Sequence, residues 1–142
     1  MSKKLDLYLA NLGVNYVKLH NLHWNVIGRG FKQVHEYLEA MYDETTESFD
    51  EVAEYQKMVG EYPKASLEEY LKITTIKELE SKDYSIEDAL KIAVEDQKLI
   101  RDLATEIRNE ADDKGEVILV ALMEGEVEAQ NKHIWFIESM LK

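Results

Sequence analysis

Residues 23–54, HWNVIGRGFKQVHEYLEAMYDETTESFDEVAE, run through a glycine-containing turn into a long segment with helical spacing. Gly28 and Gly30 mark the turn, because glycine adopts the backbone conformations that end a helix at little cost. Beyond them, apolar residues recur at intervals of three and four over residues 31–59. The stretch therefore predicts two helices joined by a short turn and lying side by side as an antiparallel hairpin.

The same spacing begins the first of these helices at residue 5 and predicts two more helices, over residues 85–113 and over residues 117–141. Ser85 is followed three residues later by Asp88, a pattern typical of a helix N-terminal cap. Asp113, Lys114 and Gly115 make a tight hinge before the last segment. The last two helices should therefore form a second antiparallel hairpin.

One long link, residues 61–84, connects the two predicted hairpins. Gly60 and Pro63 end the helix before it, and Ser66 is the candidate cap of a short helix within it, over residues 66–71. Two hairpins joined by one long crossover form a ferritin-like bundle. We expect an all-α fold, a ferritin-like four-helix bundle with a short extra helix in the crossover, as a single domain over residues 1–142.

Composition limits the possible functions. The chain has 142 residues, of which 45% are apolar and 32% charged, as in an ordinary soluble globular protein. It has no cysteine, so disulfides, thiolate catalysis and cysteine-based metal sites are excluded. It has no long apolar run, so a cytoplasmic protein without a membrane segment is expected. Its net charge of −12 repels nucleic acid and attracts cations.

Two imidazoles and three carboxylates are the candidate metal ligands: His23, His35, Glu39, Asp50 and Glu54. At about 100° per residue, the four on the predicted second helix span roughly 100° of its surface, beside the apolar stripe. His35 and Asp50 are nevertheless fifteen residues apart, which corresponds to roughly 22 Å along a helix. One chain therefore cannot close such a site alone.

The usual ferritin-like alternative is a di-iron centre inside one bundle, built with Glu-x-x-His motifs. This chain has Lys32 three residues before His35 and Gln130 three residues before His133. We therefore do not expect an intrachain centre.

A two-fold axis near residues 44 and 45 resolves the distance problem. It would place His35 and Glu39 of one chain opposite Asp50 and Glu54 of a second copy, and it would form each site twice per dimer. His23, just before the turn, would join His35 at the end of the hairpin. The expected partner is therefore a second copy of the chain, packed through the helix over residues 31–59.

The motif His23-Trp24-Asn25-Val26-Ile27-Gly28, followed by Val34-His35 and Glu39, resembles the first signature of the Dps family, the mini-ferritins. Residues 49–54, FDEVAE, match the start of its second signature. The resemblance implies a ferroxidase centre between subunits, with Trp24 beside the metal ligands as a catalytic residue that absorbs stray oxidising equivalents. The ligands that it implies are His23, His35, Glu39, Asp50 and Glu54.

The resemblance also implies that twelve subunits assemble into a hollow shell. Such shells oxidise ferrous iron, preferably with hydrogen peroxide, and store the ferric mineral, which protects against oxidative damage. Acids near the hinge, Asp112, Asp113 and Glu116, would line a pore for iron, although Val117 and Val120 interrupt the run of acids.

Some family members also coat DNA through lysine-rich tails. This chain offers only Lys3 and Lys4 near its start and Lys142 at its end, so DNA binding is not expected. The family also usually has an arginine after the position of Glu54, where this chain has Tyr55.

Three functions remain as alternatives. The first is a peroxide-consuming ferroxidase and iron store, the second a DNA-coating protein of the nucleoid, and the third a helical assembly module whose site holds zinc or no metal. Taken alone, His23 also fits a core histidine bonded to a backbone carbonyl. His20 and His133 are interpreted as structural or packing residues.

Overall fold

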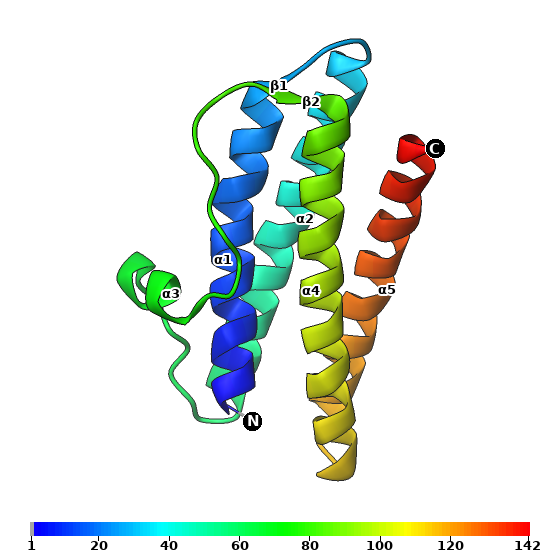
Figure 1. Cartoon of the computed structure of the whole chain (residues 1–142). Coiled ribbons are helices and arrows are strands. Elements are labelled where there is room, and N and C mark those ends of the chain that lie inside the picture. The colour runs from blue at the N-terminus through cyan, green and yellow to red at the C-terminus, as the bar shows by residue number, and fades with distance from the viewer. Residues whose placement is uncertain (1) are drawn as a thin grey trace.

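The computed structural model describes residues 2–142, which form four long helices and one short one. Helix α1 (Ser2–Asn25) is antiparallel to α2 (Phe31–Met58), and α4 (Ile86–Asp113) is antiparallel to α5 (Val117–Leu141), as Figure 1 shows. The long connection carries α3 (Leu67–Ile73) and runs over the outside of α1 from one end of the bundle to the other. The predicted all-α, ferritin-like arrangement of two hairpins with one crossover is confirmed.

Local signals at the helix ends behave as the sequence predicts. The Ser66 and Ser85 hydroxyls accept hydrogen bonds from the backbone N–H groups of Glu69 and Asp88, at 3.3 and 3.0 Å. Gly60, just past the end of α2, has φ = 86°, a conformation that favours glycine. The first helix starts at Ser2, three residues earlier than expected.

A two-residue parallel ladder was not predicted. Strand β1 (Val26–Ile27) follows α1 directly and pairs with β2 (Tyr84–Ser85) at the end of the crossover. Segments of two residues carry no periodic pattern, so sequence spacing cannot reveal them. The ladder fastens the end of the crossover to the α1–α2 turn, and α4 begins directly after it.

The apolar core consists of two clusters, one toward each end of the bundle. One contains Tyr8, Leu9 and Ile107, and the other contains Leu22, Leu38 and Ile137. Each long helix contributes to both clusters and carries buried polar residues between its two contributions: Asn15, Lys18, Thr45, Asp96, Gln97, Glu126 and Gln130. A buried polar layer therefore crosses the middle of the bundle.

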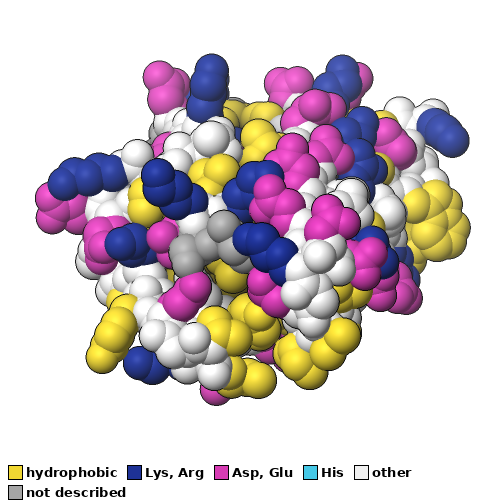
Figure 2. All heavy atoms as spheres, turned by 90° about the horizontal axis from the view of Figure 1, so that it is seen from below, with side chains coloured by type: hydrophobic (Ala, Val, Ile, Leu, Met, Phe, Trp, Pro, Cys, Tyr) yellow, Lys and Arg dark blue, Asp and Glu magenta, His cyan; other side chains and the backbone are white. Residues whose placement is uncertain are grey.

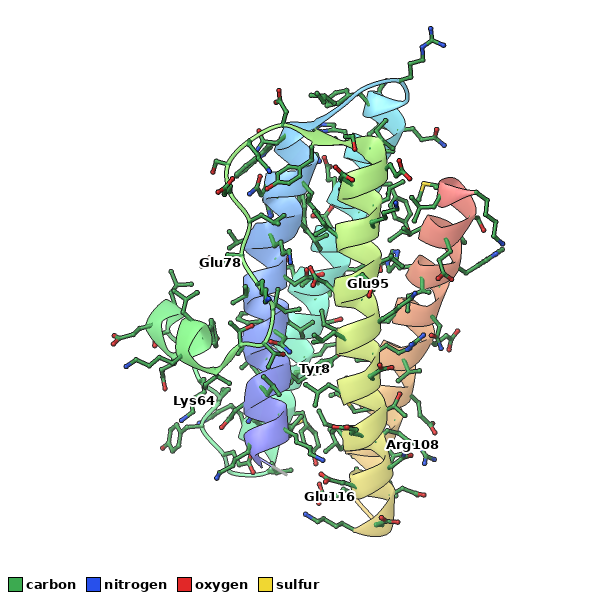
Figure 3. All side chains as sticks on the ribbon, in the orientation of Figure 1. Tyr8, Lys64, Glu78, Glu95, Arg108 and Glu116 are labelled. Atoms are coloured by element: carbon green, nitrogen blue, oxygen red, sulfur yellow. The ribbon has the colours of Figure 1, made fainter. Side chains whose placement is uncertain are left out.

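Three side-chain contacts join helices across this layer. The ammonium group of Lys18 lies 2.7 Å from the Asp96 carboxylate, and both side chains are buried. The Tyr8 hydroxyl donates to the Glu126 carboxylate at 2.7 Å, and Ser48 donates to the other oxygen of that carboxylate at 2.8 Å. Figure 3 marks Tyr8 on α1 inside the bundle. These contacts link α1 to α4 and link α1 and α2 to α5.

Within residues 2–142, no helix combines the length and the apolar composition needed to cross a membrane.

Two helical glycines provide a test of the packing between α1 and its neighbours. A Cβ on Gly13 would lie 3.1 Å from the Tyr70 ring and 3.3 Å from the Phe49 ring, whereas a Cβ on Gly125 would meet no described atom within 4 Å. Gly125→Ala should raise the free energy of unfolding by up to about 1 kcal/mol through helix propensity. Gly13→Ala gains the same propensity but adds crowding that costs about 1–3 kcal/mol.

Urea unfolding of the two variants beside the parent chain measures this difference. The Gly13→Ala protein should unfold at a lower urea concentration than the Gly125→Ala protein. Equal midpoints would contradict the close approach of α3 and α2 to α1.

Candidate metal centre

His23 and His35 hold each other in place at the α1–α2 turn. The Nδ1 atom of His23 lies 2.6 Å from the carbonyl oxygen of His35, and the Nδ1 atom of His35 lies 2.7 Å from the carbonyl oxygen of His23. The two rings stack with centroids 3.7 Å apart and planes 11° apart. Each imidazole is therefore fixed in position and in orientation.

The hydrogen bonds also fix which ring nitrogen carries the proton. A carbonyl oxygen only accepts, so Nδ1 of His23 and Nδ1 of His35 both donate. The Nε2 atom of each neutral ring is then unprotonated, which is the form that binds a metal. The predicted ligand role of His23 and its alternative, a buried histidine bonded to a carbonyl, are thus compatible.

Glu39 lies beside this pair. One carboxylate oxygen is 3.8 Å from Nε2 of His23, and about half of the Glu39 side chain is exposed. His23, His35 and Glu39 therefore form one group, which contains two nitrogen donors and one carboxylate. We call this group the histidine half-site.

Asp50 and Glu54 form the second group, one turn apart on the exposed surface of α2. A hydrogen bond with the Asp50 carboxyl and the negative charge of that carboxylate raise the pKa of Glu54 above its usual value. Two neighbouring carboxylates that repel each other gain from a cation placed between them. We call this pair the carboxylate half-site.

The two half-sites do not meet within one chain. His35 and Glu39 lie on the same helix, α2, as Asp50 and Glu54, and His35 and Asp50 are separated along it by roughly 22 Å at 1.5 Å per residue. Among residues 2–142, no three histidine or acidic side chains come together in an arrangement that could hold a metal ion. His23, His35 and Glu39 are neighbours at the α1–α2 turn, and Asp50 and Glu54 are neighbours further along α2, but neither group is arranged to hold a metal ion by itself.

Trp24 lies next to the histidine half-site and is 66% exposed in the single chain. Its ring meets the His20 ring edge-on at 5.4 Å, and His20 stacks on Tyr42 at 3.7 Å. Tyr42 in turn meets the edge of the His23 ring at 5.3 Å. Tyr42 thus links the rings of His20 and His23.

His133 has a polar environment that its sequence context did not indicate. The Tyr37 hydroxyl lies 2.6 Å from Nδ1 of His133, and Nε2 of His133 is hydrogen-bonded to the Glu44 carboxylate. Burial and the charge of Glu44 raise the pKa of Tyr37 well above its usual value. Spacing could not have revealed this chain of contacts, because it joins α2 to α5.

Tyr55 is buried and belongs to the apolar core, and its hydroxyl donates to Glu116 at 3.3 Å. Arg108 lies 3.5 Å from Asp112 at the same end of the bundle, where Figure 3 labels Arg108 and Glu116. Tyr55 therefore helps to hold the start of α5. Asp112 and Asp113 are exposed at the α4–α5 end of the bundle, and their role in lining a pore for iron stays a prediction.

Comparisons with known proteins agree over almost the whole chain. A model of the ferritin-like domain matches residues 2–142. Antigen TpF1 of Treponema pallidum is 34% identical over 140 residues, which cover 99% of this chain and 79% of that protein. The DNA protection during starvation protein of Helicobacter pylori is 32% identical, with 93% of this chain and 92% of that protein covered.

Solved structures give the same result. The crystal structure of antigen TpF1 superposes with a TM-score of 0.97 at 34% identity, covering 99% of this chain and 90% of that one. The structure of Dps from Staphylococcus aureus superposes with a TM-score of 0.94 at 32% identity, covering 99% of this chain and 93% of that one.

The histidine tautomers can be measured directly. In metal-free protein, the ¹⁵N chemical shifts of His23 and His35 should report a proton on Nδ1 and none on Nε2. His133 is the internal control, because the carboxylate of Glu44 only accepts and therefore requires the proton on Nε2.

Solid-state NMR of histidine-labelled protein distinguishes the two nitrogens even in a large assembly. A proton on Nε2 of His23 or His35 in the metal-free protein would contradict the reciprocal arrangement.

Proposed function

This chain belongs to the Dps family of ferritin-like proteins, and from that membership we propose that it oxidises ferrous iron at centres shared between two subunits. The observation that carries the proposal is the histidine half-site, in which two imidazoles are held with their Nε2 atoms free beside a carboxylate. The carboxylate half-site supplies the complementary oxygen donors. Each half-site is incomplete alone, so the proposal requires a second copy.

The positions of the half-sites along α2 support a two-fold contact. The residue numbers of His35 and Glu54 are symmetric about a point between residues 44 and 45, and so are those of Glu39 and Asp50. Two antiparallel copies of α2 that cross at this point bring each histidine half-site to the carboxylate half-site of the other copy. Each dimer then has two equivalent centres.

The donor set suits iron as the substrate. Neutral imidazole and carboxylate together bind ferrous iron, and the hard carboxylate oxygens favour the ferric product. Hydrogen peroxide is the proposed oxidant. Two ferrous ions each give up one electron, the O–O bond takes both and breaks, and two hydroxide ions form. Because the electrons are delivered as a pair, no hydroxyl radical needs to be released.

Trp24 is proposed to act as a guard at this centre. An indole ring beside the metal ligands can give up one electron to a stray oxidant and so spare more distant groups. Its contact with His20, and through that ring with Tyr42, supports this role.

Storage completes the proposed function. We propose that the chain assembles into a hollow shell, with twelve subunits as the expected number, and that the ferric product accumulates inside as mineral. The surplus of 29 acidic over 17 basic side chains favours cation binding over much of the surface. The protein would thereby act as a ferroxidase and iron store that limits oxidative damage.

Anaerobic loading with ferrous iron followed by titration with hydrogen peroxide tests this function. The parent assembly should consume about two ferrous ions per peroxide molecule at paired metal positions. His35→Ala and Asp50→Ala should each abolish fast oxidation, whereas Glu87→Ala, an exposed acid on α4 that pairs with Lys91, should not. If neither substitution slowed the oxidation of ferrous iron, the assigned centre would be contradicted.

A mixing experiment tests whether the centre is shared. Shells co-assembled from equal amounts of His35→Ala and Asp50→Ala chains contain dimers in which one of the two centres is intact. With random pairing, about one quarter of the parent activity should return. The control mixes shells assembled separately, which should stay inactive. If activity returned in neither sample, His35 and Asp50 would belong to a centre within one chain.

DNA coating is the second candidate, and the name of several relatives, DNA protection during starvation protein, favours it. Its electrostatic basis in this chain is weak. Lys4, one of the two lysines near the N-terminus, is paired with Glu110 at 2.7 Å. Figure 2 shows that Lys and Arg groups alternate with acids over the face at this end of the bundle. Such a surface releases few counterions from DNA.

A gel-shift assay with low micromolar shells at moderate salt should therefore detect no stable complex. A variant with a lysine-rich extension at the N-terminus is the positive control and should shift the DNA. Stable complexes of the unmodified chain would favour DNA coating instead.

A further inference from the structure

The buried polar layer between the two apolar clusters encloses a small cavity. Its volume is about 30 Å³, and residues of all four long helices line it, among them Asn15, Thr45, Gln97, Glu126 and Gln130. A cavity of this size holds roughly one or two water molecules. Its lining is mixed, with Leu12, Met41 and Ile100 beside the polar side chains, whereas cavities that stay empty in proteins are lined by apolar side chains throughout.

Two amide side chains at this cavity have polar atoms without hydrogen-bond partners among the described residues. Asn15 is 1% exposed, and neither its Nδ2 nor its Oδ1 atom has a partner. The Oε1 atom of Gln130, a residue that is 6% exposed, has none either, although the Nε2 atom of Gln130 donates to Tyr8. Buried polar groups without partners are costly, so such atoms indicate a missing ligand.

The donor or acceptor character of these unpaired atoms indicates which ligand would bind them. Asn15 presents both a donor and an acceptor, and Gln130 presents an acceptor. A metal ion or an ammonium ion would satisfy the acceptors and leave the amide donor of Asn15 unpaired. Water both donates and accepts, and buried water molecules ordinarily make two to four such bonds. The chemistry of the set therefore selects water.

The cavity also adjoins a larger opening. A groove of about 770 Å³ runs between α2 and α5, and it shares with the cavity the lining residues Glu44, Ser48, Glu126, Ala129 and His133. Glu126 is buried, and its carboxylate accepts from Tyr8 and Ser48 without a cation among its recorded contacts. Glu126 lines both the cavity and the groove, so water in the cavity would lie beside a carboxyl group that also borders the groove.

We infer that the polar layer contains a hydration site, in which water binds Asn15 and Gln130 beside the buried Glu126 carboxyl group, which lines both the cavity and the α2–α5 groove. The site is separate from the proposed ferroxidase residues and does not depend on their function. It explains why buried amides lie in the layer between the two apolar clusters.

A high-resolution crystal structure of the assembled protein tests the inference. Electron density for one or two water molecules is expected within hydrogen-bond distance of Asn15 and Gln130. Soaking with rubidium or manganese salts should produce no anomalous signal in the cavity. A dry cavity in which Asn15 has turned to another partner, or a cation in place of water, would overturn the inference.

Solution measurements provide an independent test. Asn15→Leu removes the two unpaired atoms of Asn15 and fills part of the cavity, so ¹⁷O relaxation dispersion should count about one fewer long-lived water per subunit. Asn21→Leu is the matched control, because the Asn21 amide is bonded to the carbonyls of Leu79 and Glu80 outside this layer. Its count should equal that of the parent.

Gln130→Met serves as a second variant if Asn15→Leu does not fold, and it should lower the count in the same way. Unchanged counts in a folded variant would show that no water is held by these side chains.

Discussion

The reciprocal hydrogen bonds between His23 and His35 are the interaction on which the rest depends. The carbonyl group of His23 lies in the last turn of α1, where helix carbonyls have no partner within the helix. The His35 ring satisfies this carbonyl, and the His23 ring reaches back to the carbonyl of His35 on α2. The same two bonds therefore close the α1–α2 hairpin and leave both Nε2 atoms free for a metal.

Closing the hairpin in this way also explains why the site is divided. A histidine that helps to end α1 must lie at the turn, and its neighbour on α2 must lie in the first turns of that helix. The carboxylates Asp50 and Glu54 then lie several turns further along the same helix, too far away to share a metal ion with the histidines of their own chain. The metal centre that we propose is consequently a property of an interface, and assembly would precede activity.

The interior of the bundle follows a different rule. Ferritin-like bundles can hold metals between their four helices with several acids and histidines. In the described part of this chain, the buried polar layer contains two acids, Asp96 and Glu126, and no histidine. Glu126 is the acid in that layer that faces Tyr8 and Ser48, and Asp96 is neutralised by Lys18. Neutral amides occupy the remaining space, which favours water over metal in the interior.

Sequence spacing by itself determined the helices, their serine and glycine ends, the crossover and the candidate ligands, because these depend on interactions between residues close in the chain. It also indicated that one chain could not close the site, since helix rise is a constant. Tertiary structure decided which nitrogen of each histidine is free, the environment of Tyr42 and His133, the β1–β2 ladder and the polar layer. Each of these features arises where residues of different segments meet, and sequence periodicity does not indicate which distant residues come into contact.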